Sequence, residues 1–154
     1  MKRLHVHSRV ADVAASVAYY TKFFGQAPDV QKHDYARWLL DDPRVNFAIS
    51  NEPGHAPGIE HLGFQFDTRA EFEAFRGAAD RAPLGRTDED GTTCCYANSD
   101  KAWFTDPDNV PWETFFTFGA SDSYHALDTP SGAPGKANGM PVMTHQAGAC
   151  CVPD

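Results

Sequence analysis

The sequence predicts an α+β fold in which two βαβββ modules curve together into a cupped, partly open β-barrel. A pattern that begins at His5 begins again at His61, 56 residues further along the chain. Each start alternates as a strand does, and each is followed by apolar residues at helical spacing and then by further strand-like runs. Half-sheets of this kind, packed edge to edge, enclose a cup that is a natural ligand site.

The first module is expected over residues 1–50. Its opening strand contains His5, and a helix follows in which Val13, Val17, Tyr20 and Phe24 recur at helical spacing. Further strands are expected at 30–33, 35–40 and 45–50. Residues 51–58 contain two prolines and two glycines, which makes this segment the linker between the modules.

The second module is expected over residues 59–118. Its opening strand contains His61, and Phe72 and Phe75 then mark a helix that Ala78 and Ala79 extend. Further strands are expected at 92–97, 102–105 and 112–118. The turn Asp-Pro-Asp-Asn at 106–109 joins two of them, and asparagine at position 109 suits a left-handed backbone. Residues 119–154 contain five glycines and four prolines without apolar periodicity, and we expect a flexible tail there.

The charge balance and the hydropathy exclude several kinds of partner. The chain has 13 basic and 21 acidic residues, a net charge of −8, which argues against a nucleic-acid partner. No run of 18 apolar residues is long enough to span a membrane. The amino terminus lacks the apolar core of a secretory signal, so a cytoplasmic protein is expected.

Three residues at matching places in this scheme could bind a metal. His5 and His61 open the two modules, and Glu113 lies among aromatic residues in the last strand. A lone carboxylate there is costly unless it is paired, hydrogen-bonded or bound to a metal. Two histidines and one carboxylate suit non-haem Fe(II), and zinc could use the same ligands. The alternative is that each is an ordinary hydrogen-bonded residue, and His7 and His55 are rival ligands.

The four cysteines form two adjacent pairs, which is neither a disulfide framework nor the spacing of a structural zinc site. In a regular strand Cys94 and Cys95 would point to opposite faces, so they can share a ligand only where the backbone bends, and Gly91 allows a bend. Paired thiolates suit a soft centre such as cadmium, or trivalent arsenic with one carbon substituent. The alternative is a pair of inert, buried, small apolar residues. Cys150 and Cys151 in the tail are either accessory thiols or idle.

The opening of the chain carries a recognisable set of residues, namely His5-Val6, Val10-Ala11-Asp12, Ser16-Val17-Ala18-Tyr19-Tyr20 and Phe24-Gly25. This set resembles the vicinal oxygen chelate superfamily, which includes glyoxalase I, extradiol dioxygenases and bleomycin- or fosfomycin-resistance proteins. The resemblance implies the paired βαβββ fold and a divalent metal in the cup.

A more specific pattern extends over about residues 3–118. Its most specific part is the run from Thr92 to Ala97 with the downstream Asp100-Lys101. The rest of the pattern comprises Tyr35-Ala36-Arg37-Trp38, Asn46-Phe47-Ala48-Ile49, His61-Leu62-Gly63-Phe64-Gln65, Ala102-Trp103, Asp106-Pro107-Asp108 and Trp112-Glu113. This pattern resembles the carbon–arsenic lyases of the ArsI type and the related cadmium-induced CadI proteins.

The resemblance implies an enzyme that uses Fe(II) and dioxygen to break the carbon–arsenic bond of trivalent organoarsenicals and release arsenite. It implies metal ligands at His5, His61 and Glu113, and arsenic-binding thiols at Cys94 and Cys95. The chain departs from the pattern at position 7, where a small or apolar residue is usual, and at Asn109, where glycine is usual. A soft-metal binder of the CadI type and another enzyme of the superfamily remain as alternatives, and a homodimer is plausible.

Overall fold

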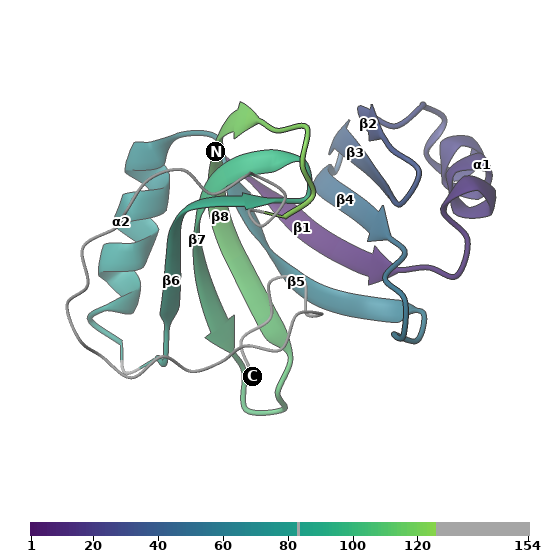
Figure 1. The fold of residues 1–154 in the computed structure, drawn as a ribbon. Helices are drawn as coiled ribbons and strands as arrows, with labels where there is room; N and C mark the ends of the chain where they lie inside the picture. Colours follow the sequence, from purple (N-terminus) through teal and green to yellow (C-terminus); the bar gives the residue numbers. More distant parts are fainter. Residues whose placement is uncertain (83, 126–154) are drawn as a thin grey trace, which may run out of the picture.

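The computed structural model describes residues 1–82 and 84–125, which form one curled sheet of eight strands with two helices (Figure 1). The first half comprises β1 (Lys2–Arg9), α1 (Val13–Phe24), β2 (Val30–Gln31), β3 (Tyr35–Asp41) and β4 (Arg44–Ser50). The second half comprises β5 (Gly58–Phe66), α2 (Arg69–Ala79), β6 (Thr87–Cys94), β7 (Ala97–Thr105) and β8 (Pro111–Ala120). The predicted fold class is therefore confirmed.

The sheet repeats the same strand arrangement on both sides of its centre. Its strand order is β2-β3-β4-β1-β5-β8-β7-β6, in which β1 and β5 are the central, antiparallel pair. In each half the first strand pairs in parallel with the last one, β1 with β4 and β5 with β8. The opening strands of the two modules therefore lie side by side in the middle of the sheet, where they can share a site.

Local signals in the sequence set the limits of both helices. Asp12 caps α1 by accepting a hydrogen bond from the backbone N–H of Ala15, and Gly25 ends it with a left-handed φ of 73°. Thr68 caps α2 through the backbone N–H of Glu71, whose side chain returns to the Thr68 hydroxyl group. Position 25 needs glycine because a Cβ atom strains this backbone conformation.

Each helix covers its own half of the sheet, and each half has its own apolar core (Figure 1). Val13 and Val17 of α1 pack against buried Trp38 and Phe47. Phe72 of α2 is fully buried against its own half of the sheet, in a cluster with Phe66 and Ala102. A fully buried phenylalanine contributes about 1.5–3 kcal/mol relative to exposure, so these faces hold the helices in place.

The structure differs from the expected elements around the cysteine pair. The strand expected at 92–97 is in fact the end of β6, a two-residue turn at Cys95 and Tyr96, and the start of β7. The last strand, β8, extends to Ala120, beyond the expected limit at 118. The segment 126–154, with Cys150 and Cys151, lies outside the described residues. Neither described helix is long and apolar enough to cross a membrane.

Candidate metal centre and thiol pair

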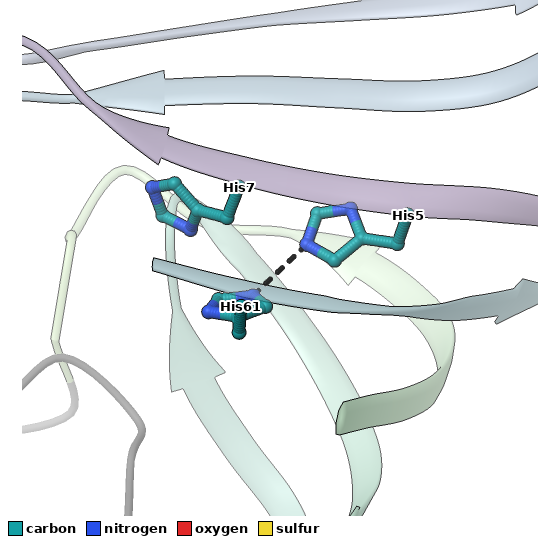
Figure 2. Close-up of side chains that lie close together, drawn as sticks. All are labelled: His5, His7 and His61. Atoms are coloured by element: carbon teal, nitrogen blue, oxygen red, sulfur yellow. Dashed lines mark hydrogen bonds between the residues drawn. The ribbon is translucent and has the colours of Figure 1, made fainter. Parts of the chain in front are cut away.

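Three of the predicted ligands converge on the concave side of the central strands. His5 lies on β1, His61 on β5 and Glu113 on β8, and all three side chains are buried. The Nε2 atom of His5 lies 3.1 Å from the Nε2 atom of His61 (Figure 2). The Oε2 atom of Glu113 lies 3.4 Å from the first nitrogen and 3.2 Å from the second.

These separations fit a shared metal ion. Ligand atoms about 2.1 Å from one ion lie about 3.0 Å apart when their bonds make a right angle and about 3.4 Å apart at a tetrahedral angle. Nδ1 of His5 lies 3.1 Å from the Asn46 carbonyl oxygen, which accepts its N–H and leaves a lone pair on Nε2. That lone pair faces the Glu113 carboxylate, and a cation would satisfy both groups.

The protonation states favour metal binding. Burial lowers the pKa of His5 to about 4, although the Glu113 carboxylate opposes the shift, so the ring is neutral at pH 7. Burial alone would raise the pKa of Glu113. The nearby Lys101 ammonium and the hydrogen bond from His61 outweigh burial and hold that pKa well below its usual range. A neutral imidazole and an ionised carboxylate are the forms that ligate metals.

Lys101 forms an ion pair with the carboxylate oxygen of Glu113 that does not face the two histidines. Its Nζ atom lies 2.5 Å from Oε1 of Glu113, while Oε2 faces the two histidines, and both side chains are buried. The lysine therefore fixes the rotation of the carboxyl group and compensates its charge. Sequence reasoning placed Lys101 in a recognisable motif without giving it a role. A lysine directly before the apolar run Ala102-Trp103-Phe104 was the available signal.

His7, expected as a rival ligand, also belongs to the cluster. It lies on the same face of β1 as His5 and directly opposite His61 on β5. Nitrogen atoms of His5, His7 and His61 all lie within 4.8 Å of one another. The three rings are turned toward a common space (Figure 2). The other rival, His55, is exposed on the linker and lies outside this cluster.

The cysteine pair forms one thiol site because the chain turns between β6 and β7. Cys95 and Tyr96 have φ values of 55° and 62°, the left-handed pair typical of a tight hairpin turn. The turn brings the two sulfur atoms to 3.0 Å from each other, with Cys94 buried and Cys95 half-buried. The bend expected at Gly91 exists as well, with a φ of 67° at an irregularity of the β6–β7 ladder.

The residues before and after the turn hold it in place. The Asp100 carboxylate accepts a hydrogen bond from the backbone N–H of Gly91, at 2.8 Å. The Tyr124 carbonyl oxygen accepts one from the backbone N–H of Cys95, also at 2.8 Å. Non-glycine residues in the left-handed region cost about 1–2 kcal/mol each, and such strain is typical of functional sites.

The thiols and two of the three candidate metal ligands, His5 and Glu113, line the same pocket. Its walls include His5, His7, Glu113, Cys94 and Cys95. Tyr35, Arg37 and Lys101 line it too, and sequence reasoning gave these residues no role. Burial raises the pKa of Tyr35 well above its usual value, and charge on Cys95 raises it further, so its hydroxyl group stays protonated. Alternation along β3 places Tyr35 and Arg37 on one face, which was the available signal.

The fold and this centre define a class of protein. The family model described as "Glyoxalase/Bleomycin resistance protein/Dioxygenase superfamily" matches residues 2–114. The chain belongs to this superfamily. Solved structures have the same fold. A Mn(II)-bound glyoxalase from Novosphingobium aromaticivorans has a TM-score of 0.54 and is 18% identical, and the match covers 83% of this chain and 44% of the glyoxalase chain. An extradiol ring-cleaving dioxygenase from B. fuscum has a TM-score of 0.55 and is 14% identical, and the match covers 81% of this chain and 35% of the dioxygenase chain.

Relatives in sequence identify a narrower group within this superfamily. The trivalent organoarsenical cleaving enzyme of Bacillus sp. (strain MD1) is 38% identical over 119 residues, which cover 76% of this chain and 74% of that enzyme. The enzyme of the same name from Thermomonospora curvata is 31% identical over 90% of this chain and 97% of its own. Cadmium-induced protein CadI of Mycobacterium bovis is 29% identical, and the match covers 80% of this chain and 82% of CadI. The resemblance to ArsI-type lyases and CadI proteins is thereby confirmed.

Proposed function

We propose that this protein cleaves the carbon–arsenic bond of trivalent organoarsenicals, such as methylarsenite and reduced aromatic arsenicals, and releases arsenite. Fe(II) is the proposed cofactor and dioxygen the co-substrate. The observation that carries the proposal is the hairpin turn that brings the sulfur atoms of Cys94 and Cys95 to 3.0 Å in the pocket that His5 and Glu113 also line. The names of the Bacillus and Thermomonospora relatives support the substrate class.

The thiols would capture the substrate. Trivalent arsenic with one carbon substituent has two exchangeable ligands, and the thiolates of Cys94 and Cys95 can replace both. A chelate held by adjacent residues in a rigid turn fixes the arsenic atom and therefore the direction of the carbon–arsenic bond. Positioning of this kind contributes a large part of the rate when the reacting atoms are already close together.

His5, His61 and Glu113 would hold the Fe(II), which supplies the redox chemistry with dioxygen that no side chain supplies. The remaining parts of the site orient and balance these groups. Asn46 holds the Nδ1–H of His5, and Lys101 holds the outer oxygen of Glu113. With methylarsenite, one dioxygen yields arsenite and formaldehyde with atoms and electrons balanced, because the methyl carbon supplies the electrons and arsenic stays trivalent.

A second function is non-catalytic binding of a soft metal such as cadmium. Its support is the similarity to CadI together with the paired thiols, which would also chelate a soft ion. Such a binder would need Cys94 and Cys95 but neither dioxygen nor the histidine and glutamate centre. Another reaction of the superfamily would instead need the metal centre but not the thiols.

The test is arsenic speciation after the reduced, Fe(II)-loaded protein is mixed with methylarsenite, with and without dioxygen. The proposal expects arsenite only when both iron and dioxygen are present. Methylarsenite that stays intact and bound to the protein would support the binder. If the arsenical neither binds nor is cleaved, the proposal is wrong and a different substrate of the superfamily must be sought.

A further inference from the structure

His7 is a second buried histidine on β1, two residues along the strand from His5. Its side chain is fully buried, with 1% of the residue exposed, and its ring contacts the ring of His61 edge-on at 4.9 Å between centroids. An imidazole buried beside two other imidazoles is costly unless its polar atoms have partners. The two ring nitrogens of His7 therefore need polar partners inside the core.

The ring of His7 is held by polar groups from neighbouring strands. Its Nε2 atom lies 2.9 Å from the hydroxyl oxygen of Ser50 at the end of β4. Its Nδ1 atom lies 3.6 Å from the buried carboxylate of Glu60, whose other oxygen binds Arg9 at 2.7 Å. In Figure 2 one nitrogen of His7 is on the side of His5 and His61, and the other points away from them. Ser50 holds the ring at Nε2, so Nδ1, which also lies near Glu60, is the nitrogen that would face a metal.

We infer that His7 is a further protein ligand of the metal, so that the ion is held by three imidazoles and one carboxylate. The inference rests on the metal centre of the proposed function and extends it to a residue outside that triad. Nitrogen atoms of the three histidines lie within 4.8 Å of one another, close enough to bind one ion after small side-chain shifts. A six-coordinate ion would then keep two open positions instead of three.

This ligand set has chemical consequences. Replacing a water or an oxygen ligand by a third imidazole favours ions that prefer nitrogen, such as Fe(II), Ni(II), Cu(II) and Zn(II), over Mn(II) and Mg(II). Two open positions restrict what can bind the ion directly. The alternative is that His7 only positions the ring of His61 by packing against it. Both roles predict weaker metal binding when His7 is replaced, so the affinity by itself does not separate them.

The decisive measurement counts imidazole ligands. The probe is the vanadyl ion, a hard cation that does not seek the thiols, bound anaerobically to the reduced protein and examined by pulsed electron paramagnetic resonance for nitrogen couplings. The variants are His7→Gln, which can still hydrogen-bond to Ser50, and His7→Asn, in case the larger amide distorts the core. His33→Gln is the matched control, because His33 is exposed on the surface. Circular dichroism and thermal unfolding verify that each variant is folded.

Three coupled imidazole nitrogens are expected in the natural protein and in His33→Gln, and two in the folded His7 variants. Fe(II) affinity, measured by competition with a chromophoric chelator, should fall about 10–100-fold in the His7 variants. The same number of imidazole nitrogens in all proteins would overturn the inference while leaving the metal centre of the proposed function intact. A natural protein that binds neither vanadyl nor Fe(II) would overturn both.

Discussion

Gly63 on β5 lies directly opposite Glu113 on β8, and a Cβ atom on Gly63 would overlap the backbone carbonyl oxygen of Glu113. Gly63 also pairs with His5 on its other side, so it is the residue between two proposed metal ligands in one row across three strands. A glycine here lets the central strands approach closely enough for His5 and Glu113 to converge across it.

Gly63→Ala should therefore impair the centre although Gly63 is not itself a ligand. The added methyl group must push β8 away from β5, which moves Glu113 and weakens the parallel pairing. We expect a loss of about 1–3 kcal/mol in the free energy of unfolding and a loss of Fe(II) binding of tenfold or more. Urea unfolding and a chelator-competition titration measure the two effects. Gly77→Ala is the control, since Gly77 has open space around it and should tolerate a methyl group. Unchanged metal affinity in Gly63→Ala would contradict the close approach.

The thiols and the metal ligands should be separable by mutation. Cys94→Ser or Cys95→Ser should weaken methylarsenite binding about 100-fold or more, because each removes one arm of a chelate. Fe(II) loading should remain within about threefold of the natural protein, since neither sulfur atom belongs to the proposed metal triad. Binding is measured by mass spectrometry of the reduced protein, and iron by elemental analysis after desalting.

Glu113→Gln is the reciprocal variant. It preserves the volume of the side chain but replaces the anionic ligand by a neutral amide, so Fe(II) should be lost while the thiols still bind methylarsenite. A cysteine variant that loses iron, or a Glu113→Gln protein that no longer binds the arsenical although it is folded, would contradict the division of roles. Far-ultraviolet circular dichroism distinguishes these outcomes from unfolding.

Lys101→Met should destabilise the metal-free protein in a pH-dependent manner. Removing one partner of a buried ion pair costs about 3–5 kcal/mol at pH 7. The folded-state pKa of Glu113 is depressed below its unfolded value of 4.5, so the stabilisation is present above pH 4.5 and is lost as the pH falls through the folded-state pKa. In the variant the Lys101 charge is absent and burial raises the pKa of Glu113. The carboxyl group is then protonated at low pH, and a neutral carboxyl group costs less to bury.

The difference in unfolding free energy between the natural protein and Lys101→Met should consequently be largest near pH 7 and shrink toward pH 4. Guanidinium unfolding at several pH values measures it. Lys22→Met, at an exposed position of α1, is the control and should change stability by less than about 1 kcal/mol at every pH. A difference that does not vary with pH would show that the ion pair with Glu113 is not the cause.

The turn between β7 and β8 requires a left-handed backbone conformation at Asn109. Its φ is 64°, and the Asp106 carboxylate closes the turn through the backbone N–H groups of Asp108 and Val110, each at 2.9 Å. Asn109→Gly should change the free energy of unfolding by less than about 0.5 kcal/mol, because both residues accept this conformation. Asn109→Val should cost about 1–2 kcal/mol, because a branched side chain does not. Equal stability of the two variants in urea would contradict the left-handed conformation.

The sequence by itself determined the fold class, the presence and approximate place of both helices and the position of the Asp106–Asn109 turn. These features depend on local periodicity and capping, which operate between residues a few positions apart and are therefore visible in the order of the amino acids. It also brought His5, His61 and Glu113 forward as a possible set, because the modular repeat places two of them at equivalent positions and aromatic neighbours single out the third.

Only the tertiary structure decided how the side chains meet. Cys94 and Cys95 face one pocket because two consecutive non-glycine residues adopt a left-handed turn, which no local propensity predicts and which the surrounding hydrogen bonds must hold. His7 joins His5 and His61 because of the β1–β5 register, and Lys101 reaches Glu113 across β7 and β8. Pairing between distant strands fixes these contacts, and a sequence pattern records the face on which a residue lies but not its neighbour across the sheet.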